Sequence, residues 1–418
     1  MTTRTSSPSI GGLPVWLLCL FVALLALGTD EFVISGILPA VAADLDVSPG
    51  TGGQLVTAFA IAFALGAPVL AFLTDRFEKK AVLVSALAVF ALANLAVAVS
   101  DAFAVTFVLR IVAGLAAAAV SPTAMAIAAT AAPPGRDGRY LAVVTAGLTV
   151  ALFTGVPFGA LLGNLISWRA TFVLIAVVSA LVCILCIFLA PSVPGGSGTS
   201  IGERLAPARN PRVLAMVLAM LLSGAGGLMF YSYLGTILST DLGAGSGTVI
   251  GALLVVGIVG VVAVFMGGAL TDRFGPRPAR VMVLGGHAVT LGALAAYLGL
   301  SSGGSLVFLF VLIGLWAVFA WALSPVMLAS IMASSAGNPM LALALGISGL
   351  YAGSAIGAAI GGYLIDNFGP GAVPLVGTVW LVIAVALATV RTAPAAAPAE
   401  HLEKADTASA RSDVTGAS

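Results

Sequence analysis

Three ionisable residues lie deep inside long apolar runs of the sequence: Asp30, Glu31 and Arg110. Facing lipid at the centre of a membrane helix, each would cost at least ~2.5–3.5 kcal/mol, so we expect them to face protein or a wet cavity. Glu31 and Arg110 are expected at similar depths, and the long arginine side chain can span the difference. We predict that Arg110 pairs with one of the two acids or donates to nearby carbonyls, and that one acid carries protons.

Asp30 and Glu31 are neighbours in the sequence, and neighbours on a helix point about 100° apart. One of them should therefore face a cavity and the other a neighbouring helix. Burial favours the neutral carboxyl, whereas a nearby arginine favours the charged form. A carboxyl poised between these effects can release its proton on one side of a membrane and regain it on the other. The alternative is structural, with the three residues only locking two helices together.

Aromatic residues in several apolar runs are candidate walls of a substrate pocket, because such pockets are mostly apolar and aromatic with a few polar groups. Helix packing is the alternative role for each of them. Tyr233 and Phe153 are the first choices. The whole set is Phe153, Phe230, Tyr231, Tyr233, Trp316, Trp321 and Tyr351.

Other chemistry has little support. Cys183 and Cys186 form a Cys-x-x-Cys pattern, but they lie in an apolar run without further ligands, and we interpret them, like Cys19, as small apolar residues. His287 is interpreted as a packed or interfacial side chain. The sequence contains no His-Glu-x-x-His motif, Walker loop or Cys/His cluster. We expect no catalytic residue, metal, cofactor or nucleic-acid partner, which disfavours a polytopic membrane enzyme or sensor.

The elements that position these residues are expected to be membrane helices. The chain has 418 residues, of which 60% are hydrophobic and 8% charged, against about 25% charged in a soluble domain. A hydrocarbon core of ~30 Å needs ~20 apolar residues per helix. Runs of that length predict twelve spans, near residues 15–41, 53–74, 81–99, 102–127, 139–163, 169–190, 212–238, 247–270, 280–300, 304–331, 341–364 and 371–391.

The predicted spans fall into two halves, which makes the expected fold an all-α membrane protein with two pseudo-symmetric six-helix bundles. A stretch rich in Gly, Ser and Pro separates the halves and is expected to be a flexible cytoplasmic linker. The predicted organisation is a cytoplasmic N-terminus at 1–14, bundles at 15–190 and 211–391, the linker at 191–210 and a disordered cytoplasmic tail at 392–418.

Orientation follows from lysine and arginine, which concentrate in cytoplasmic loops. With the N-terminus inside, the outer loops contain Arg169 as their sole basic residue. The inner loops then contain Arg76, Lys79, Lys80, Arg136, Arg139, Arg204, Arg209, Arg212, Arg273, Arg277 and Arg280. We therefore expect both termini in the cytoplasm.

The halves repeat one another. Residues 73–77 read Leu-Thr-Asp-Arg-Phe and recur at 270–274, an offset of 197, and a row of glycines at 155, 159 and 163 recurs at 353, 357 and 361. At the same offset, Gly227, Leu228 and Val307 stand where the first half has its two acids and its arginine. Two parallel halves with a site at the midplane between them are typical of transporters. Proton chemistry is accordingly predicted in the first half alone.

The two turns and the glycine rows are candidates for conformational gating. Asp75 is expected to cap or pair with a neighbouring helix end in one state and to lose that contact in another. The glycines allow close helix approach and are expected to give a smooth surface on which the halves can rock. The gating set is Asp75, Arg76, Lys79, Lys80, Asp272, Arg273, Arg277, Gly147, Gly155, Pro157 and Gly159.

These motifs resemble the major facilitator superfamily over the whole chain from the first span to the twelfth. The loop signature of that family, Gly-x-Leu-x-Asp-Arg-x-Gly-Arg/Lys-Arg/Lys, is matched at 71–80 with Ala71 and Glu78 in place of the glycines, and at 268–277 with both glycines kept. Residues 28–32 (Gly-Thr-Asp-Glu-Phe) resemble a first-span motif of twelve-span drug/proton antiporters, close to chloramphenicol-resistance and arabinose-efflux-type exporters.

Further motifs support that resemblance. Arg110 with Gly114 resembles the fourth-span Arg-x-x-Gln-Gly motif, with Ala113 for the Gln, and Trp168-Arg169 opens the sixth span as in those exporters. The fifth span resembles the antiporter motif of that family at Gly147, Gly155, Pro157 and Gly159. The resemblance implies that Glu31 faces the cavity as proton carrier and that Gly155 and Pro157 suppress leak.

The expected function is proton-coupled efflux of a small, largely apolar, drug-like compound by alternating access. Chloramphenicol-like molecules are among the possible substrates. No cofactor is expected. The expected partners are this substrate, protons and the lipid bilayer. The chain is expected to act as a monomer in a bacterial plasma membrane. An exporter of a sugar or endogenous metabolite, or an inward-running symporter, remains the alternative, because a first-span proton site suits either direction.

Overall fold

The structure is a computed structural model that describes residues 9–10, 13–133, 136–195, 210–300, 305–334 and 339–389. Most of the predicted linker, the tail and residues 1–8 lie outside these ranges, so the predicted domain boundaries stay predictions. In the N-terminal half the helices are α1 (Val15–Phe32), α2 (Ile34–Asp44), α3 (Pro49–Leu73), α4 (Lys79–Ala98), α5 (Phe103–Ala131), α6 (Asp137–Val150), the π-helical η1 (Ala151–Gly155), α7 (Val156–Leu165) and α8 (Trp168–Leu189).

The C-terminal half repeats this order of helices. It consists of α10 (Pro211–Ser232), α11 (Leu234–Asp241), α12 (Ser246–Phe274), α13 (Pro276–Leu300), α14 (Leu306–Ser334), α15 (Pro339–Phe368) and α16 (Ala372–Thr389). Within the described residues, twelve helices are long and apolar enough to cross a membrane, counting α6, η1 and α7 as one. The predicted all-helical fold is confirmed, apart from a two-stranded ribbon that pairs β1 (Ser9–Ile10) with β2 (Leu13–Pro14).

The first and seventh spans are broken, whereas the sequence predicted continuous helices at 15–41 and 212–238. The breaks fall at Val33, between α1 and α2, and at Tyr233, between α10 and α11. Near Val33 the Gly36 N–H donates to the Val33 carbonyl three residues back at 3.0 Å, and the Ser35 hydroxyl donates to the Phe32 carbonyl at 2.7 Å. Pro39 has no N–H for the Ser35 carbonyl, so regular hydrogen bonding cannot run through this stretch.

The fifth span also departs from the continuous helix predicted at 139–163. Its middle is the π-helical turn η1, where the Val156 N–H donates to the Ala151 carbonyl five residues back. Pro157 follows immediately and cannot donate to the carbonyl of Phe153, so the wider turn accommodates the missing hydrogen bond.

The structural register of the two halves differs from the single offset of 197 used above. The breaks at Val33 and Tyr233 lie 200 residues apart, and the prolines inside α5 and α14, Pro122 and Pro325, lie 203 apart. Loops of different length shift each helix separately. The structural counterparts of Asp30, Glu31 and Arg110 are therefore Phe230, Tyr231 and Ile313, which corrects the match to Gly227, Leu228 and Val307. The C-terminal half still has no charge at these positions.

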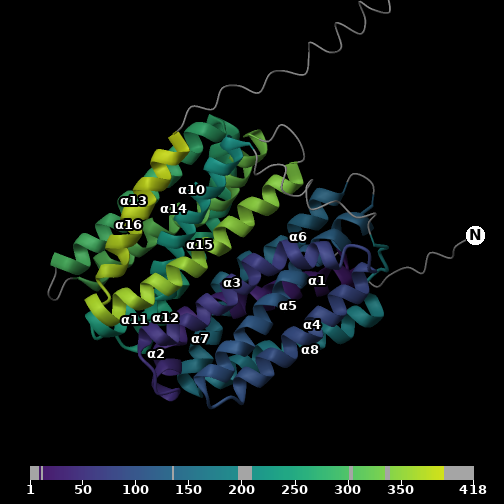
Figure 1. Cartoon of the computed structure of the whole chain (residues 1–418), viewed down its shortest axis with the longest axis horizontal. Helices are drawn as coiled ribbons and strands as arrows, with labels where there is room; N and C mark the ends of the chain where they lie inside the picture. Colours follow the sequence, from purple (N-terminus) through teal and green to yellow (C-terminus); the bar gives the residue numbers. More distant parts are fainter. Residues whose placement is uncertain are drawn as a thin grey trace, which may run out of the picture.

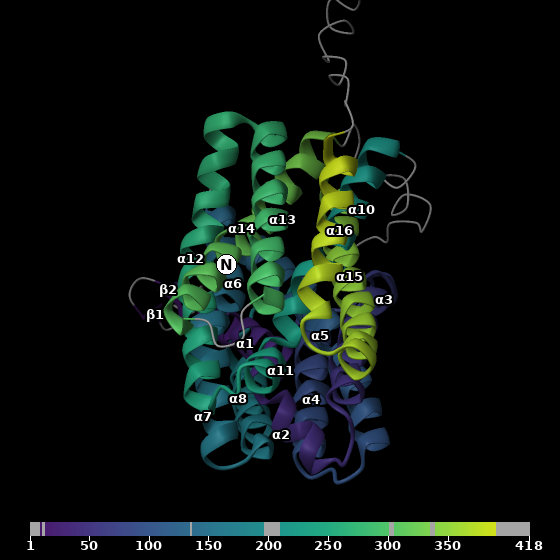
Figure 2. The same cartoon turned by 90° about the vertical axis from the view of Figure 1, so that its left-hand side faces the viewer.

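The two bundles converge toward α2 and α11, as Figures 1 and 2 show from two sides. At this end, which we call the Ser48 end, Asp366 of α15 accepts from the Ser48 hydroxyl at 2.6 Å and from the Gly50 N–H at 3.0 Å. Deeper in, the Tyr233 hydroxyl donates to the Ala358 carbonyl at 2.7 Å. The opposite end carries the Asp75 turn, and we call it the Asp75 end.

The N-terminal half has its own charge cluster at the Ser48 end. Arg169, at the start of α8, bonds Asp44, and it also bonds Asp101 at 2.8 Å. The Trp168 indole donates to Asp44 at 3.1 Å. The Arg169 hydrogen bond holds the pKa of the exposed Asp44 carboxyl below its usual value. These contacts tie α2, the loop between α4 and α5, and the start of α8 together within one half.

Candidate functional site

The predicted ion pair of Arg110 is confirmed, and its partner is Asp30. One guanidinium nitrogen of Arg110 lies 2.8 Å from both Asp30 carboxylate oxygens, and the other lies 3.4 Å from the Asp30 carbonyl. Arg110 is 1% and Asp30 0% exposed. The guanidinium also lies 4.5 Å from the centroid of the Phe59 ring. The pair joins α1 to α5 in the interior of the N-terminal half.

Glu31 points elsewhere, as expected from the ~100° turn between adjacent helix residues. It is partly exposed, and one of its carboxylate oxygens accepts a hydrogen bond from the Tyr351 hydroxyl at 2.8 Å. Tyr351 belongs to α15 of the C-terminal half and stacks on Phe63 of α3, with ring centroids 4.0 Å apart. Glu31 thus forms no ion pair among the described residues and bonds across the two halves, in contrast to Asp30.

A small cavity lies beside Glu31, between the halves. Its volume of about 10 Å³ is close to that of one water molecule on the same measure. It is therefore too small for a drug-sized molecule in this state. The N-terminal half lines it with Glu31, Phe32, Ser35, Val56, Phe59, Ala60 and Arg110, and the C-terminal half with Leu228, Tyr231, Ser232 and Ser354.

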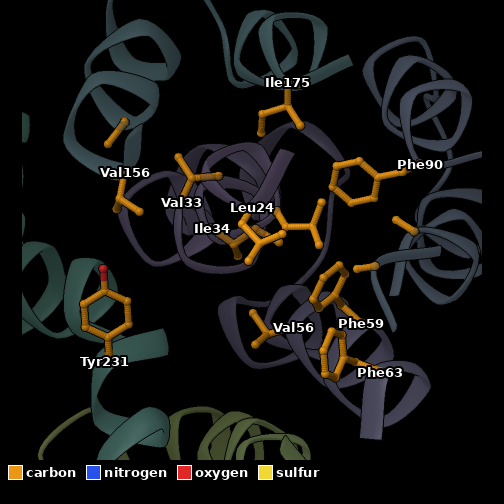
Figure 3. Packing of buried hydrophobic residues seen from close by; sticks show 14 of the residues in the cluster. Leu24, Val33, Ile34, Val56, Phe59, Phe63, Phe90, Val156, Ile175 and Tyr231 are labelled. Carbon is orange, nitrogen blue, oxygen red and sulfur yellow. The ribbon is translucent and has the colours of Figure 1, made fainter. Parts of the chain in front are cut away.

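Three of the predicted wall residues lie between the halves in contact with Glu31 or its neighbour Phe32. Tyr231 and Trp321 both meet Phe32 edge to face, with ring centroids 5.6 and 5.5 Å away, and Tyr351 bonds Glu31. Figure 3 shows Tyr231 reaching from the C-terminal half toward the helix that carries Val33. The Trp321 indole N–H is buried without an acceptor in the described part of the chain. Tyr351 therefore contacts the Glu31 carboxylate directly, and Tyr231 lines the small cavity beside it.

The other four predicted wall residues lie away from the small cavity, although Tyr233 and Phe153 also lie between the halves. Phe230 and Trp316 pack edge to face at 4.9 Å inside the C-terminal half, where the Trp316 indole donates to His287 at 3.1 Å. Tyr233, fully buried, makes the carbonyl contact near the Ser48 end. Phe153 contributes backbone to a contact between η1 and α12, where a Cβ added at Gly257 would come within 2.6 Å of the Phe153 Cα. Their predicted contact with a substrate remains a prediction.

The turn at the Asp75 end is held by local bonds. Lys79 pairs with Asp75 at 3.2 Å, and the Lys79 N–H donates to the Val193 carbonyl at 2.9 Å. Arg76 and Arg273 each lie over the phenylalanine that follows them, at 5.0 and 5.4 Å from the ring centroid. Among the described residues, Lys80, Asp272 and Arg277 form no ion pair. The gating role of both turns stays a prediction.

The glycine rows pack within each half rather than between the halves. Gly155 and Gly159 lie against Thr29 and Val33 of the first span, and a Cβ at Gly159 would come within 2.7 Å of a Val33 methyl. Gly147 packs against the backbone of α1, and Pro157 is buried. In the second half, Gly353 and Gly357 meet the backbone of α10 in the same way. The expected close helix approach is confirmed, and the helices that carry the rows contact the other half through other residues, α15 on α3 and η1 on α12.

A larger hollow of about 390 Å³ opens beside α1, and its lining is apolar apart from two threonines. The hydroxyls of Thr29 and Thr154 each donate a hydrogen bond to the carbonyl four residues earlier, at 2.8 Å. All lining residues belong to the N-terminal half. No ionisable side chain lines this hollow, so it offers no proton chemistry. No cluster of three or more metal-ligating side chains occurs in the described ranges either.

The sequence interpretation missed Ser232, Ser354 and Ser35, which line the small cavity. Serine in an apolar run carries little signal, because its hydroxyl usually bonds a carbonyl one turn back. Their positions gave a weak hint: Ser232 follows Tyr231 directly, and Ser354 lies three residues after Tyr351, on the same helix face.

The family description Major Facilitator Superfamily matches residues 20–347. The chloramphenicol resistance protein of Streptomyces lividans is 32% identical over 372 residues, which cover 86% of this chain and 91% of that protein. The inner membrane transport protein YdhP of Escherichia coli (strain K12) is 26% identical, covering 87% of this chain and 92% of that protein.

Solved structures share the fold. A D-xylose-proton symporter superposes with a TM-score of 0.74 at 16% identity, covering 90% of this chain and 97% of that one. An inward-facing bacterial homolog of the human lysosomal transporter Spinster gives 0.72 at 17% identity, with 91% and 98% covered. From the match to its family description and the similarity to these relatives over most of their length, the chain belongs to the Major Facilitator Superfamily of membrane transporters.

Proposed function

We propose that this transporter exports a small, largely apolar compound in exchange for protons, with Glu31 as the proton carrier. The observation that carries the proposal is the position of Glu31. Its carboxylate lies between the two halves, is partly exposed, and has no cationic partner among the described residues. Asp30, one residue earlier, is fully buried and paired with Arg110. Of the two acids, Glu31 is therefore the one free to change its charge.

The contact with Tyr351 supports coupling between protonation and movement. As a carboxylate, Glu31 accepts the Tyr351 hydroxyl across the halves, and hydrogen bonds to charged groups are worth about 1.5–3 kcal/mol. Protonation removes that charge and weakens the bond between α1 and α15. A proton taken up by Glu31 would thereby shift the balance between states of the transporter, since a ligand acts through its different affinity for each state.

The aromatic side chains around Glu31 support an apolar substrate. Phe32, Tyr231 and Trp321 form an edge-to-face group, and the unpaired Trp321 indole offers one donor. The similarity to a protein named for chloramphenicol resistance makes chloramphenicol, a small compound with an aromatic ring, the first substrate to test. With the basic turns in the cytoplasm, the structure corresponds to a state closed toward the outside.

The experiment uses everted membrane vesicles with an acidic interior and a pH-sensitive dye. Chloramphenicol and a panel of lipophilic drugs are added to wild type, Glu31→Gln, Asp30→Asn and Glu78→Gln. Glu78 is an exposed carboxylate in the turn and serves as the matched control. We expect proton release from wild type and Glu78→Gln and none from Glu31→Gln.

Other results would change the proposal in defined ways. Equal release by wild type and Glu31→Gln would exclude Glu31 as carrier. No release for any drug in wild type, with uptake or release of a labelled sugar or metabolite instead, would favour the alternative substrate class. Proton movement in the same direction as the substrate would identify a symporter.

A further inference from the structure

The small cavity beside Glu31 contains more polar groups than its protein contacts satisfy. Arg110 is 1% exposed, yet its Nε–H is buried without an acceptor in the described part of the chain, although its other two nitrogens bond Asp30. Leaving such a donor unpaired is costly for any buried group, and more so for a charged one. The same cavity is lined by Ser232 and Ser354, which are 6% exposed each.

The size and lining of the cavity fit one ligand. Its volume of about 10 Å³ accommodates a single water molecule, and a buried water needs two to four polar partners. The lining offers a donor on Arg110, an acceptor on Glu31 and hydroxyls on Ser232 and Ser354, neither of which bonds another of the described residues. Since no larger polar molecule fits and an apolar one would leave these groups unpaired, water is the matching occupant.

We infer that this cavity is a binding site for one water molecule, and that this water transmits the protonation state of Glu31 to the C-terminal half. The inference rests on the proposed function, in which Glu31 carries the proton. In both states the water accepts from the Arg110 Nε–H, which holds its position. The site is shared between the halves, because Glu31 and Arg110 come from one and both serines from the other.

The hydrogen bonds balance in each state. When Glu31 is a carboxylate, the water donates one hydrogen to it and the other to a serine oxygen. When Glu31 is protonated, its O–H donates to the second lone pair of the water, and both water hydrogens turn toward Ser232 and Ser354. Protonation of Glu31 thus adds one hydrogen bond from the water to the C-terminal half, and the water itself neither gains nor loses a proton.

The first test is structural and does not depend on transport. A crystal structure at a resolution that shows ordered waters should contain one water in this cavity, within about 3.2 Å of the Arg110 Nε. Absence of such density, with the Arg110 Nε bonded to a protein acceptor instead, would overturn the site.

The second test separates the hydroxyl from the shape. Threonine and valine have the same outline, so Ser354→Thr and Ser354→Val occupy the same space, and only threonine keeps the hydroxyl that accepts from the water. We expect Ser354→Val to slow drug-induced proton release at least tenfold relative to Ser354→Thr, about 1.4 kcal/mol in the barrier.

The control is Ser223, a buried serine of α10 whose hydroxyl bonds the Ala219 carbonyl at 2.7 Å within its own helix. Ser223→Thr and Ser223→Val should release protons at equal rates. Equal rates for the two Ser354 variants, in a transporter whose wild type does exchange protons for drug, would overturn the relay while leaving the proposed function intact. If wild type exchanges no protons, the proposed function fails and the water density still decides the site.

Discussion

The buried pair between Asp30 and Arg110 gives a stability prediction that the geometry makes quantitative. Both side chains are almost fully enclosed, and the guanidinium contacts both carboxylate oxygens at 2.8 Å. Asp30→Asn removes the negative charge and leaves the arginine in place. Arg110→Met removes the positive charge and keeps most of the side-chain volume.

The two single changes are expected to differ in cost. Removing one partner of a buried ion pair costs about 3–5 kcal/mol, because the other charge stays buried without compensation. Arginine cannot lose its proton in a protein, so Asp30→Asn should lie at the upper end of that range. In Arg110→Met the aspartate can take up a proton and become neutral, so the cost should lie at the lower end. The double variant leaves no buried charge and should be more stable than Asp30→Asn alone.

The measurement is the free energy of unfolding in mixed detergent micelles, followed by tryptophan fluorescence for the four proteins of the cycle. Asp101→Asn is the matched control, since Asp101 pairs with Arg169 but is 91% exposed, and such surface pairs contribute about 0–1 kcal/mol. Additive costs in the double variant, or a loss for Asp30→Asn no larger than for Asp101→Asn, would refute the reasoning from burial.

Three further predictions concern contacts between and within the halves. Asp366→Asn weakens the contact at the Ser48 end. In spin-label distance measurements it should raise the population open at that end about tenfold, corresponding to about 1.4 kcal/mol. Asn367→Ala should leave that population unchanged, since the Asn367 side chain bonds its own helix. Tyr351→Phe should free Glu31 and loosen the closed state by about 1.5–3 kcal/mol, while leaving stacking on the α3 aromatic in place; an unchanged distance distribution would contradict this. Gly155→Val should cost about 1–3 kcal/mol of stability through crowding against α1, and Gly247→Val, which meets open space, should cost less.

Much of the fold could be predicted because the bilayer imposes simple rules. Helix length, the charge of loops and the repeat at Asp75 and Asp272 are each visible in one dimension, and twelve spans follow from them. The pairing of Arg110 with an acid was predictable for the same reason, since a buried charge requires a partner. The close packing of Gly159 on the first span follows from the small side chain.

The remaining features depend on contacts between distant segments. The break at Val33 needs Pro39 and Ser35 acting together, which no periodicity reveals. The register shift between halves arises from loop lengths, so the counterpart of Glu31 is Tyr231 rather than Leu228. Tyr351 becomes the partner of Glu31 only because α15 packs along α3, and the serine hydroxyls of the cavity have only a weak sequence signature.

The adjacency of Asp30 and Glu31 explains how one helix can serve both stability and coupling. A turn of ~100° between neighbours directs Asp30 into the N-terminal half, where it pairs with Arg110, and directs Glu31 to the boundary with the C-terminal half. In the proposed mechanism the pair fixes α1 to α5 at this depth, so a change at Glu31 acts on Tyr351 and on the shared cavity. Arg110 also lines that cavity, so the ion pair and the proposed proton site adjoin the same space. A single charge change at Glu31 can then alter the contact between the halves without weakening the half that contains it.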